Sequence, residues 1–128
     1  MVIDTSALLV ILLQEPEAQQ YSAAIAAASR RIISSVSFLE TSIVLQARKG
    51  PAAGRELDLL IHKAKIEIVS FTAEHAETAR QAWHDFGKGR HKAALNLGDC
   101  CSYALSKISG EPLLFKGDDF RRTNVAEA

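Results

Sequence analysis

The chain has 128 residues, of which 48% are hydrophobic and 23% are charged, a composition typical of a folded globular protein. The length leaves no room for two catalytic domains, so we expect a single domain over residues 1–128, and the composition excludes extended disorder. Fifteen lysines and arginines balance fifteen acidic residues, which excludes a protein that coats polyanions generally but leaves a local basic patch open.

Short apolar runs alternate with longer segments of helical periodicity along the chain. The apolar runs predict strands at 2–3, 31–34, 66–71 and 112–115, with a last edge strand at 123–125. The periodic segments predict helices at 5–14, 17–29, 37–49, 53–65, 72–86 and 98–109, with a basic loop at 87–91 and a turn at 118–122. Strands separated by helices are typical of a parallel sheet covered on both faces. The predicted fold class is α/β, a three-layer α/β/α sandwich with a mainly parallel central sheet.

Cysteine usage and hydropathy bear on where the protein works. Cys100 and Cys101 are neighbours in sequence and poorly placed for a bridge within the chain, so no disulfide scaffold is expected. The apolar stretch 7–13 is too short to span a bilayer, and it lacks the preceding basic region of a secretory signal. We therefore expect a cytoplasmic protein that does not contact membranes.

Acidic residues follow the predicted strands at the edge where an open parallel sheet binds its ligands. Asp4 ends the first strand, Glu40 lies in the first turn of the helix after the second, and Asp99 begins the last long helix. Asp118 and Asp119 follow the strand at 112–115. Carboxylates that converge repel one another, and oxygen ligands suit Mg²⁺ or Mn²⁺ rather than Zn²⁺. Such a site typically activates water and holds a phosphodiester for in-line displacement.

Each of these acids also has a purely structural explanation. Asp4 can cap the helix that follows it, and Glu40 can close a capping box with Ser37. Asp99 can complement the dipole of its helix, and the pair 118–119 can simply form a turn. The joint placement of the acids, rather than any single one, favours a functional site.

Four segments resemble, in order and in spacing, the motifs of PIN domains, and specifically those of VapC-type toxin ribonucleases from bacterial toxin–antitoxin pairs. These segments span 1–8, 34–41, 91–105 and 111–120, so the resemblance covers essentially the whole chain. In the last motif Gly117 takes the first acidic position of the family's Asp-x-Asp-Phe pattern. Asp119, directly before Phe120, therefore inherits the role of fourth acid. Asp118 is an additional carboxylate and a weaker candidate metal ligand.

The resemblance implies an endoribonuclease that hydrolyses RNA phosphodiester bonds with Mg²⁺ or Mn²⁺. Asp4 and Asp99 would ligate the metal directly, and Glu40 and Asp119 would complete the cluster through a second metal or by orienting water. Ser6 would support these ligands by hydrogen bonding. The resemblance also implies a cognate VapB-type antitoxin that blocks the site, and toxin homodimers that assemble with it.

Basic side chains flank these acids in sequence, as an RNA-cleaving site requires. We predict RNA contacts from six of them: Lys88, Arg90, His91 and Lys92 before Asp99, and Lys116 and Arg121 around Asp119. A solvated loop is the alternative explanation of the first group.

Other functions stay open at this point. A receiver-type signalling domain has similar length and an acidic Mg²⁺ site, and Lys116 could mimic its lysine, but Ser70–Thr72 offers no phospho-acceptor. A catalytically silent RNA- or protein-binding module and a DNA nuclease are compatible with the same fold. Glu74, after the third predicted strand, satisfies the same positional rule as the other acids, so sequence organisation alone does not reject it.

Overall fold

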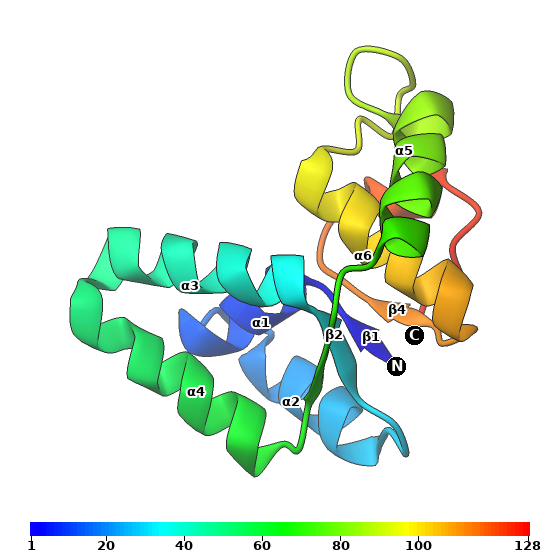
Figure 1. Ribbon diagram of the computed structural model, residues 1–128. Coiled ribbons are helices and arrows are strands. Elements are labelled where there is room, and N and C mark those ends of the chain that lie inside the picture. Colours follow the sequence, from blue (N-terminus) through cyan, green and yellow to red (C-terminus); the bar gives the residue numbers. More distant parts are fainter.

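A single parallel sheet runs through the middle of the molecule (Figure 1). The computed structural model describes all residues from 1 to 128. The strand order is β3-β2-β1-β4, and the strands are β1 (Val2–Ile3), β2 (Ile32–Ser34), β3 (Glu67–Val69) and β4 (Leu113–Leu114). Val2 is in register with Ile32 on one side and with Leu113 on the other, so β1 is a central strand. The predicted parallel sheet is confirmed.

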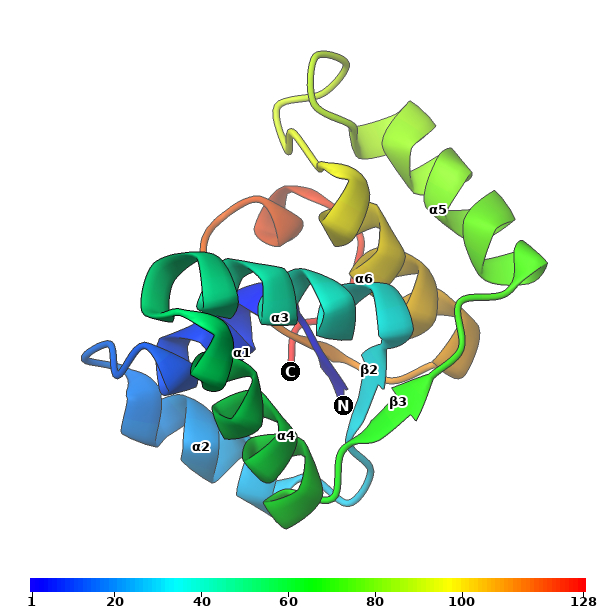
Figure 2. The same ribbon diagram turned by 60° about the vertical axis from the view of Figure 1, so that its left-hand side comes forward.

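Helices cover both faces of this sheet (Figure 2). One face carries α1 (Thr5–Leu12), α2 (Ala18–Ala27), α3 (Ser35–Lys49) and α4 (Gly54–Lys63). The other face carries α5 (Ala73–Phe86) and α6 (Leu97–Ser109). The chain fills one side of β1 with β2 and β3 and then returns to place β4 on the other side, so the direction of connection reverses between β1 and β4. Ligands of open α/β sheets bind outside the strand ends at such a reversal.

Consecutive apolar residues on the strands build a core on each face. In the pairs Val2–Ile3, Ile32–Ile33 and Leu113–Leu114, the first residue packs with α5 and α6 and the second with α1–α4. Side chains alternate between the two faces of a strand, so a strand buried on both sides needs apolar residues at adjacent positions. This pattern explains why the predicted three-layer sandwich is confirmed.

Helix ends account for most differences between the predicted and observed elements. Helix α3 begins at Ser35, because the Ser34 hydroxyl accepts a hydrogen bond from the Val36 backbone N–H at 3.2 Å. The predicted start at residue 37 is therefore too late, and Glu40 lies in the second helical turn rather than the first. The predicted helix at 53–65 is observed as a short 3₁₀ turn, Pro51–Ala53, followed by α4.

The predicted last strand at 123–125 is wrong. The Thr123 hydroxyl donates to the Phe120 carbonyl at 2.6 Å and accepts from the Val125 N–H at 3.2 Å, and these local bonds hold a turn. A 3₁₀ helix, Phe120–Arg122, precedes this turn. The chain rejoins the sheet later, through a single parallel bridge between Leu113 and Glu127. None of the helices combines the length and the apolar character needed to cross a membrane.

Candidate active site

Asp4 lies at the carboxyl end of β1 and is only 3% exposed. Its Oδ2 accepts hydrogen bonds from the Ser6 N–H at 3.0 Å and from the Ser6 hydroxyl at 2.6 Å, while its Oδ1 accepts from the Ser102 hydroxyl at 2.5 Å. Asp4 is also the N-cap of α1, so its structural explanation is confirmed. A carboxylate offers roughly four acceptor positions, and three bonds leave about one of them for a further partner.

Asp99 lies in the first turn of α6 and completes a capping box with Asn96. The Asn96 N–H donates to Asp99 Oδ2 at 3.0 Å, and the Asp99 N–H donates to Asn96 Oδ1 at 2.9 Å. The pKa of Asp99 is raised to about 7: burial is the largest cause, the negative charges of Asp4, Asp119 and Glu40 add to it, and the hydrogen bond with the Asn96 backbone opposes it. The other three acids expected at this edge of the sheet therefore lie close enough to act electrostatically on Asp99.

Glu40 reaches this group from α3 because the facing residue on α6 is a glycine. A Cβ atom built on Gly98 would lie 2.6 Å from both carboxylate oxygens of Glu40, so any larger residue there would displace the carboxylate. The capping box predicted for Glu40 and Ser37 is wrong, because Ser34 caps α3 and Ser37 lies inside the helix. Nothing in the helix cap requires Glu40.

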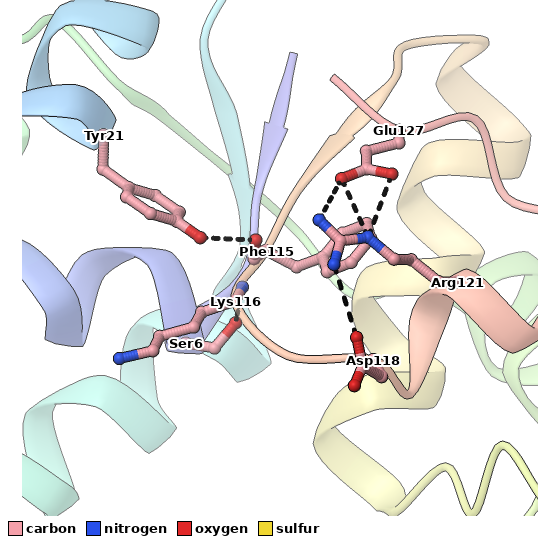
Figure 3. A network of polar contacts seen from close by, with 7 residues as sticks. All are labelled: Ser6, Tyr21, Phe115, Lys116, Asp118, Arg121 and Glu127. Atoms are coloured by element: carbon pink, nitrogen blue, oxygen red, sulfur yellow. Dashed lines mark hydrogen bonds and ion pairs between the residues drawn. The ribbon is translucent and has the colours of Figure 1, made fainter. Parts of the chain in front are cut away.

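The two aspartates after β4 lie differently. Asp119 precedes the buried ring of Phe120, and its charge contributes to the raised pKa of Asp99. Asp118, which is exposed as Asp119 is, pairs with Arg121, with Oδ1 and Nη1 3.3 Å apart (Figure 3). The contacts of Asp118 thus face the guanidinium rather than the other carboxylates.

The strand order separates Glu74 from the acids near the reversal of connection between β1 and β4. Glu74 begins α5 after β3, which is an edge strand, whereas the other acids follow β1, β2 and β4 or begin α6. Glu74 is exposed and is not among the carboxylates whose charge raises the pKa of Asp99. The ambiguity that sequence organisation left is resolved by the strand order.

The donor set at this edge fits a hard divalent cation. No three His, Cys, Asp or Glu side chains converge closely enough in this structure to hold a metal ion. Charges interact over longer distances than a metal–ligand bond spans. The other three carboxylates can therefore act on Asp99 although the four do not form a preformed metal site in this structure. All four donors are carboxylates, which suit Mg²⁺ or Mn²⁺, and a cation would let Asp99 ionise fully at neutral pH.

Two buried hydroxyls beneath the acids were not predicted as functional residues from the sequence. Ser37 on α3 and Ser102 on α6 are both fully buried, and their Oγ atoms lie 3.0 Å apart. The signal available for Ser102 was a polar residue inside the apolar run from Cys100 to Leu105, one helical turn after Asp99. Its partner could be identified only from the packing of the two helices.

Two of the six predicted RNA contacts are engaged by acids of this chain. The Lys116 ammonium lies 2.9 Å from Glu15 and 3.6 Å from a Glu17 oxygen. Arg121 pairs with Glu127 at 2.8 Å as well as with Asp118 (Figure 3). The backbone N–H of Lys116 donates to the Ser6 hydroxyl at 3.0 Å, which ties the loop after β4 to the Asp4 cluster.

The loop before α6 carries the other four predicted contacts. The Arg90 guanidinium lies 5.0 Å from the centre of the Trp83 ring, and Nδ1 of His91 accepts from the Ala93 N–H at 3.0 Å. Lys88 and Lys92 are exposed and form no ion pair. Their ammonium groups are the free positive charges of this loop.

Comparison with known proteins gives one family. The family model described as PIN domain matches residues 1–126. Ribonuclease VapC30 of Mycobacterium tuberculosis is 53% identical over 126 residues, which cover 98% of this chain and 96% of the relative. A ribonuclease VapC of Mycolicibacterium smegmatis is 54% identical over 126 residues, which cover 98% of both chains.

Solved structures of the same kind share the fold. The crystal structure of Mycobacterium tuberculosis VapC20, a toxin that cleaves the sarcin-ricin loop, superposes with a TM-score of 0.79 at 18% identity and covers 99% of this chain and 97% of its own. VapBC2 of Rickettsia felis, solved with a DNA fragment from its promoter, gives a TM-score of 0.77 at 14% identity, covering 99% and 96%. The family match contradicts the alternative of a receiver-type signalling domain.

Proposed function

Because the chain belongs to the PIN-domain family and, within it, to the VapC ribonucleases, we propose that it is an endoribonuclease toxin that hydrolyses RNA with Mg²⁺ or Mn²⁺. The proposed metal site consists of Asp4, Glu40, Asp99 and Asp119. The observation that carries it is the placement of Asp4, Glu40 and Asp119 around the partly buried Asp99, whose pKa is raised mainly by burial and further by the charges of these three carboxylates. Such an arrangement is unfavourable without a cation and favourable with one.

The residues differ in what they can contribute. Asp4 is buried and fixed by three hydrogen bonds, and Asp99 is fixed by its capping box, so both suit direct ligation. Glu40 and Asp119 complete the charge of the site or hold the attacking water. A divalent cation bound there would lower the pKa of water and offset the charge of the phosphodiester. Ser6 holds Asp4 in place.

RNA must approach an acidic site, so positive charge has to stand beside it. We propose the loop 88–92 for this role, with the free ammonium groups of Lys88 and Lys92 contacting phosphates. Arg90 and His91 are held by contacts within the chain and shape the loop. Lys116 and Arg121 can contact phosphate only if their ion pairs with Glu15 and Glu127 are broken.

Cleavage of total RNA tests the proposal. The purified chain is incubated with Mg²⁺ or Mn²⁺, with chelator, and beside the variants Asp99→Asn and Glu74→Gln. Discrete fragments that disappear with chelator and with Asp99→Asn, but persist with Glu74→Gln, support the metal-dependent site. Cleavage that survives chelator contradicts the metal requirement, and equal cleavage by Asp99→Asn contradicts the assigned site. No cleavage with any metal would favour a silent binding module.

We also propose that a VapB-type antitoxin neutralises this ribonuclease and that the toxin forms homodimers. The support comes from the family and from a similar solved structure, a toxin–antitoxin complex from Klebsiella pneumoniae. Adding the purified antitoxin to the cleavage assay should suppress the fragments. Sedimentation of the isolated chain should give the mass of a dimer, and a monomer at micromolar concentration would contradict the second proposal.

A further inference from the structure

The Asp4 carboxylate receives a hydroxyl donor on each of its two oxygens, and the two donors come from distant parts of the chain. Ser6, on the first turn of α1, donates to Oδ2 at 2.6 Å, as a local capping residue can. Ser102 donates to Oδ1 at 2.5 Å from α6, which follows nearly a hundred residues later. Ser102 is fully buried, so this bond has no competition from solvent.

The direction of the hydrogen bonds around Ser102 follows from its chemistry. A hydroxyl carries one hydrogen, and an ionised carboxylate can only accept. Because the Ser102 hydroxyl donates its one hydrogen to Asp4, it must accept in the 3.0 Å hydrogen bond between the two serines, and Ser37 is the donor. Both hydrogen bonds, from Ser37 to Ser102 and from Ser102 to Asp4, are therefore donated in the direction of the carboxylate. Hydrogen bonds in such a series strengthen one another.

The positions of these serines on their helices link them to the other acids. Ser102 lies three residues after Asp99 on α6, and Ser37 lies three residues before Glu40 on α3. Residues three apart share one face of a helix. Each helix thus presents one acid and one hydroxyl toward the end of β1, and the two hydroxyls meet beneath the acids.

We propose that Ser102 is a positioning residue that orients the Asp4 carboxylate for metal binding and fixes α6 relative to β1 and α3. This inference rests on the proposed metal cofactor. Without the Ser102 hydroxyl, the buried Oδ1 of Asp4 loses its hydrogen bond, and the carboxylate is held only from the side of Ser6. Residues that hydrogen-bond to metal ligands in this way typically change metal affinity by about 10- to 100-fold when removed.

Binding of Mn²⁺ to the full chain without RNA tests the assignment. Calorimetry and the loss of the free-Mn²⁺ paramagnetic resonance signal both report affinity independently of catalysis. Ser102→Ala should bind Mn²⁺ about 10- to 100-fold more weakly than the unaltered chain. Ser102→Thr, which restores a hydroxyl, should recover affinity, and the half-saturating Mn²⁺ concentration for RNA cleavage should shift in parallel.

Ser106→Ala is the matched control. Ser106 lies one turn further along α6, is 5% exposed, and donates to the Glu111 carbonyl at 2.6 Å, away from the acids. Its loss removes a buried hydroxyl of the same kind, so it should lower the urea midpoint without changing Mn²⁺ affinity. Mn²⁺ affinity of Ser102→Ala within about twofold of the unaltered chain would overturn the assignment.

A second variant decides the question if Ser102→Ala does not fold. Ser37→Ala leaves the bond from Ser102 to Asp4 in place and removes only the donor behind it, so a smaller loss of Mn²⁺ affinity is expected. Unchanged affinity in Ser37→Ala would then overturn the part of the assignment in which the contact between Ser37 and Ser102 fixes α6 relative to α3. Failure of the unaltered chain to bind Mn²⁺ at all would overturn the metal proposal and the role of Ser102 with it, which distinguishes the two failures.

Discussion

Replacing Asp99 by asparagine is expected to stabilise the chain at neutral pH when divalent cations are removed. Burial, reinforced by neighbouring carboxylates, raises the pKa of Asp99 from its ordinary value of 3.8 to about 7. A carboxyl with a raised pKa binds its proton more tightly in the folded state than in the unfolded state. Its contribution to stability is therefore fully present below about pH 4 and is lost as the pH rises through about 7.

The size of the effect follows from this shift. Roughly three pKa units correspond to about 4 kcal/mol at 1.36 kcal/mol per unit. Asp99 is only partly buried, so solvent screening reduces the expected gain to roughly 2 kcal/mol. Asparagine keeps an acceptor oxygen for the Asn96 N–H but loses about 0.5 kcal/mol of interaction with the helix N-terminus. We expect Asp99→Asn to gain about 1–2 kcal/mol near pH 8.

Urea and thermal unfolding with chelator, from about pH 4.5 to about pH 8, measure this gain. The advantage of Asp99→Asn should vanish toward the acidic end, and Mn²⁺ should stabilise the unaltered chain but not the variant. Asp85→Asn is the control, because Asp85 is exposed and hydrogen bonds from His84 and Gln81 lower its pKa. Equal stability of the unaltered chain and Asp99→Asn over the whole range would refute the reasoning, since Asp99 would then carry no uncompensated charge.

Three further variants, one of them a double substitution, probe other parts of the molecule. Gly98→Ala should displace the Glu40 carboxylate and reduce RNA cleavage by about 10- to 100-fold, while the urea midpoint stays equal or rises. Combined Lys88→Gln and Lys92→Gln should reduce the salt dependence of RNA binding, by about 0.7 in logarithmic slope for each phosphate that a lysine no longer neutralises. Leu105→Ala, in the core between the sheet and α6, should lower stability by about 2–5 kcal/mol in urea unfolding.

Gly98→Ala and the double lysine variant each have a matched control elsewhere in the chain. At Gly54 an added Cβ would meet only the Gln46 side chain at 3.4 Å, so Gly54→Ala should leave cleavage unchanged. Lys49 is bound to Glu56 at the end of α3, and Lys49→Gln should leave the salt dependence intact. Full cleavage by Gly98→Ala, or an unaltered slope in the double lysine variant, would contradict the corresponding assignment.

The layers of the fold could be predicted from sequence because each strand carries adjacent apolar residues. Val2–Ile3, Ile32–Ile33 and Leu113–Leu114 all bury both faces, and only helices on two sides of a sheet provide such burial. The last strand could not be predicted, because Thr123 uses its hydroxyl for local bonds that compete with the sheet. The chain reaches the sheet only at Glu127, through one bridge.

The site could be predicted only as far as strand ends determine it. Asp4, Asp99 and Asp119 follow from the rule that ligands bind at the carboxyl edge, whereas rejecting Glu74 needed the strand order. The hydroxyl of Ser102 could not be assigned at all, because its role depends on how α6 packs against β1. Local pattern identifies the charges of a site, and tertiary packing identifies the groups that hold them.

Helix capping and function are not competing explanations of these acids. Asp4 caps α1 and Asp99 completes the capping box of α6, and the same two residues lie in the group of carboxylates that repel one another. A helix N-terminus stabilises a nearby carboxylate by about 0.3–1 kcal/mol, which is less than the unfavourable energy implied by the pKa of Asp99. Capping therefore explains how the acids are held in place, and the remaining unfavourable charge explains why a cation would bind among them.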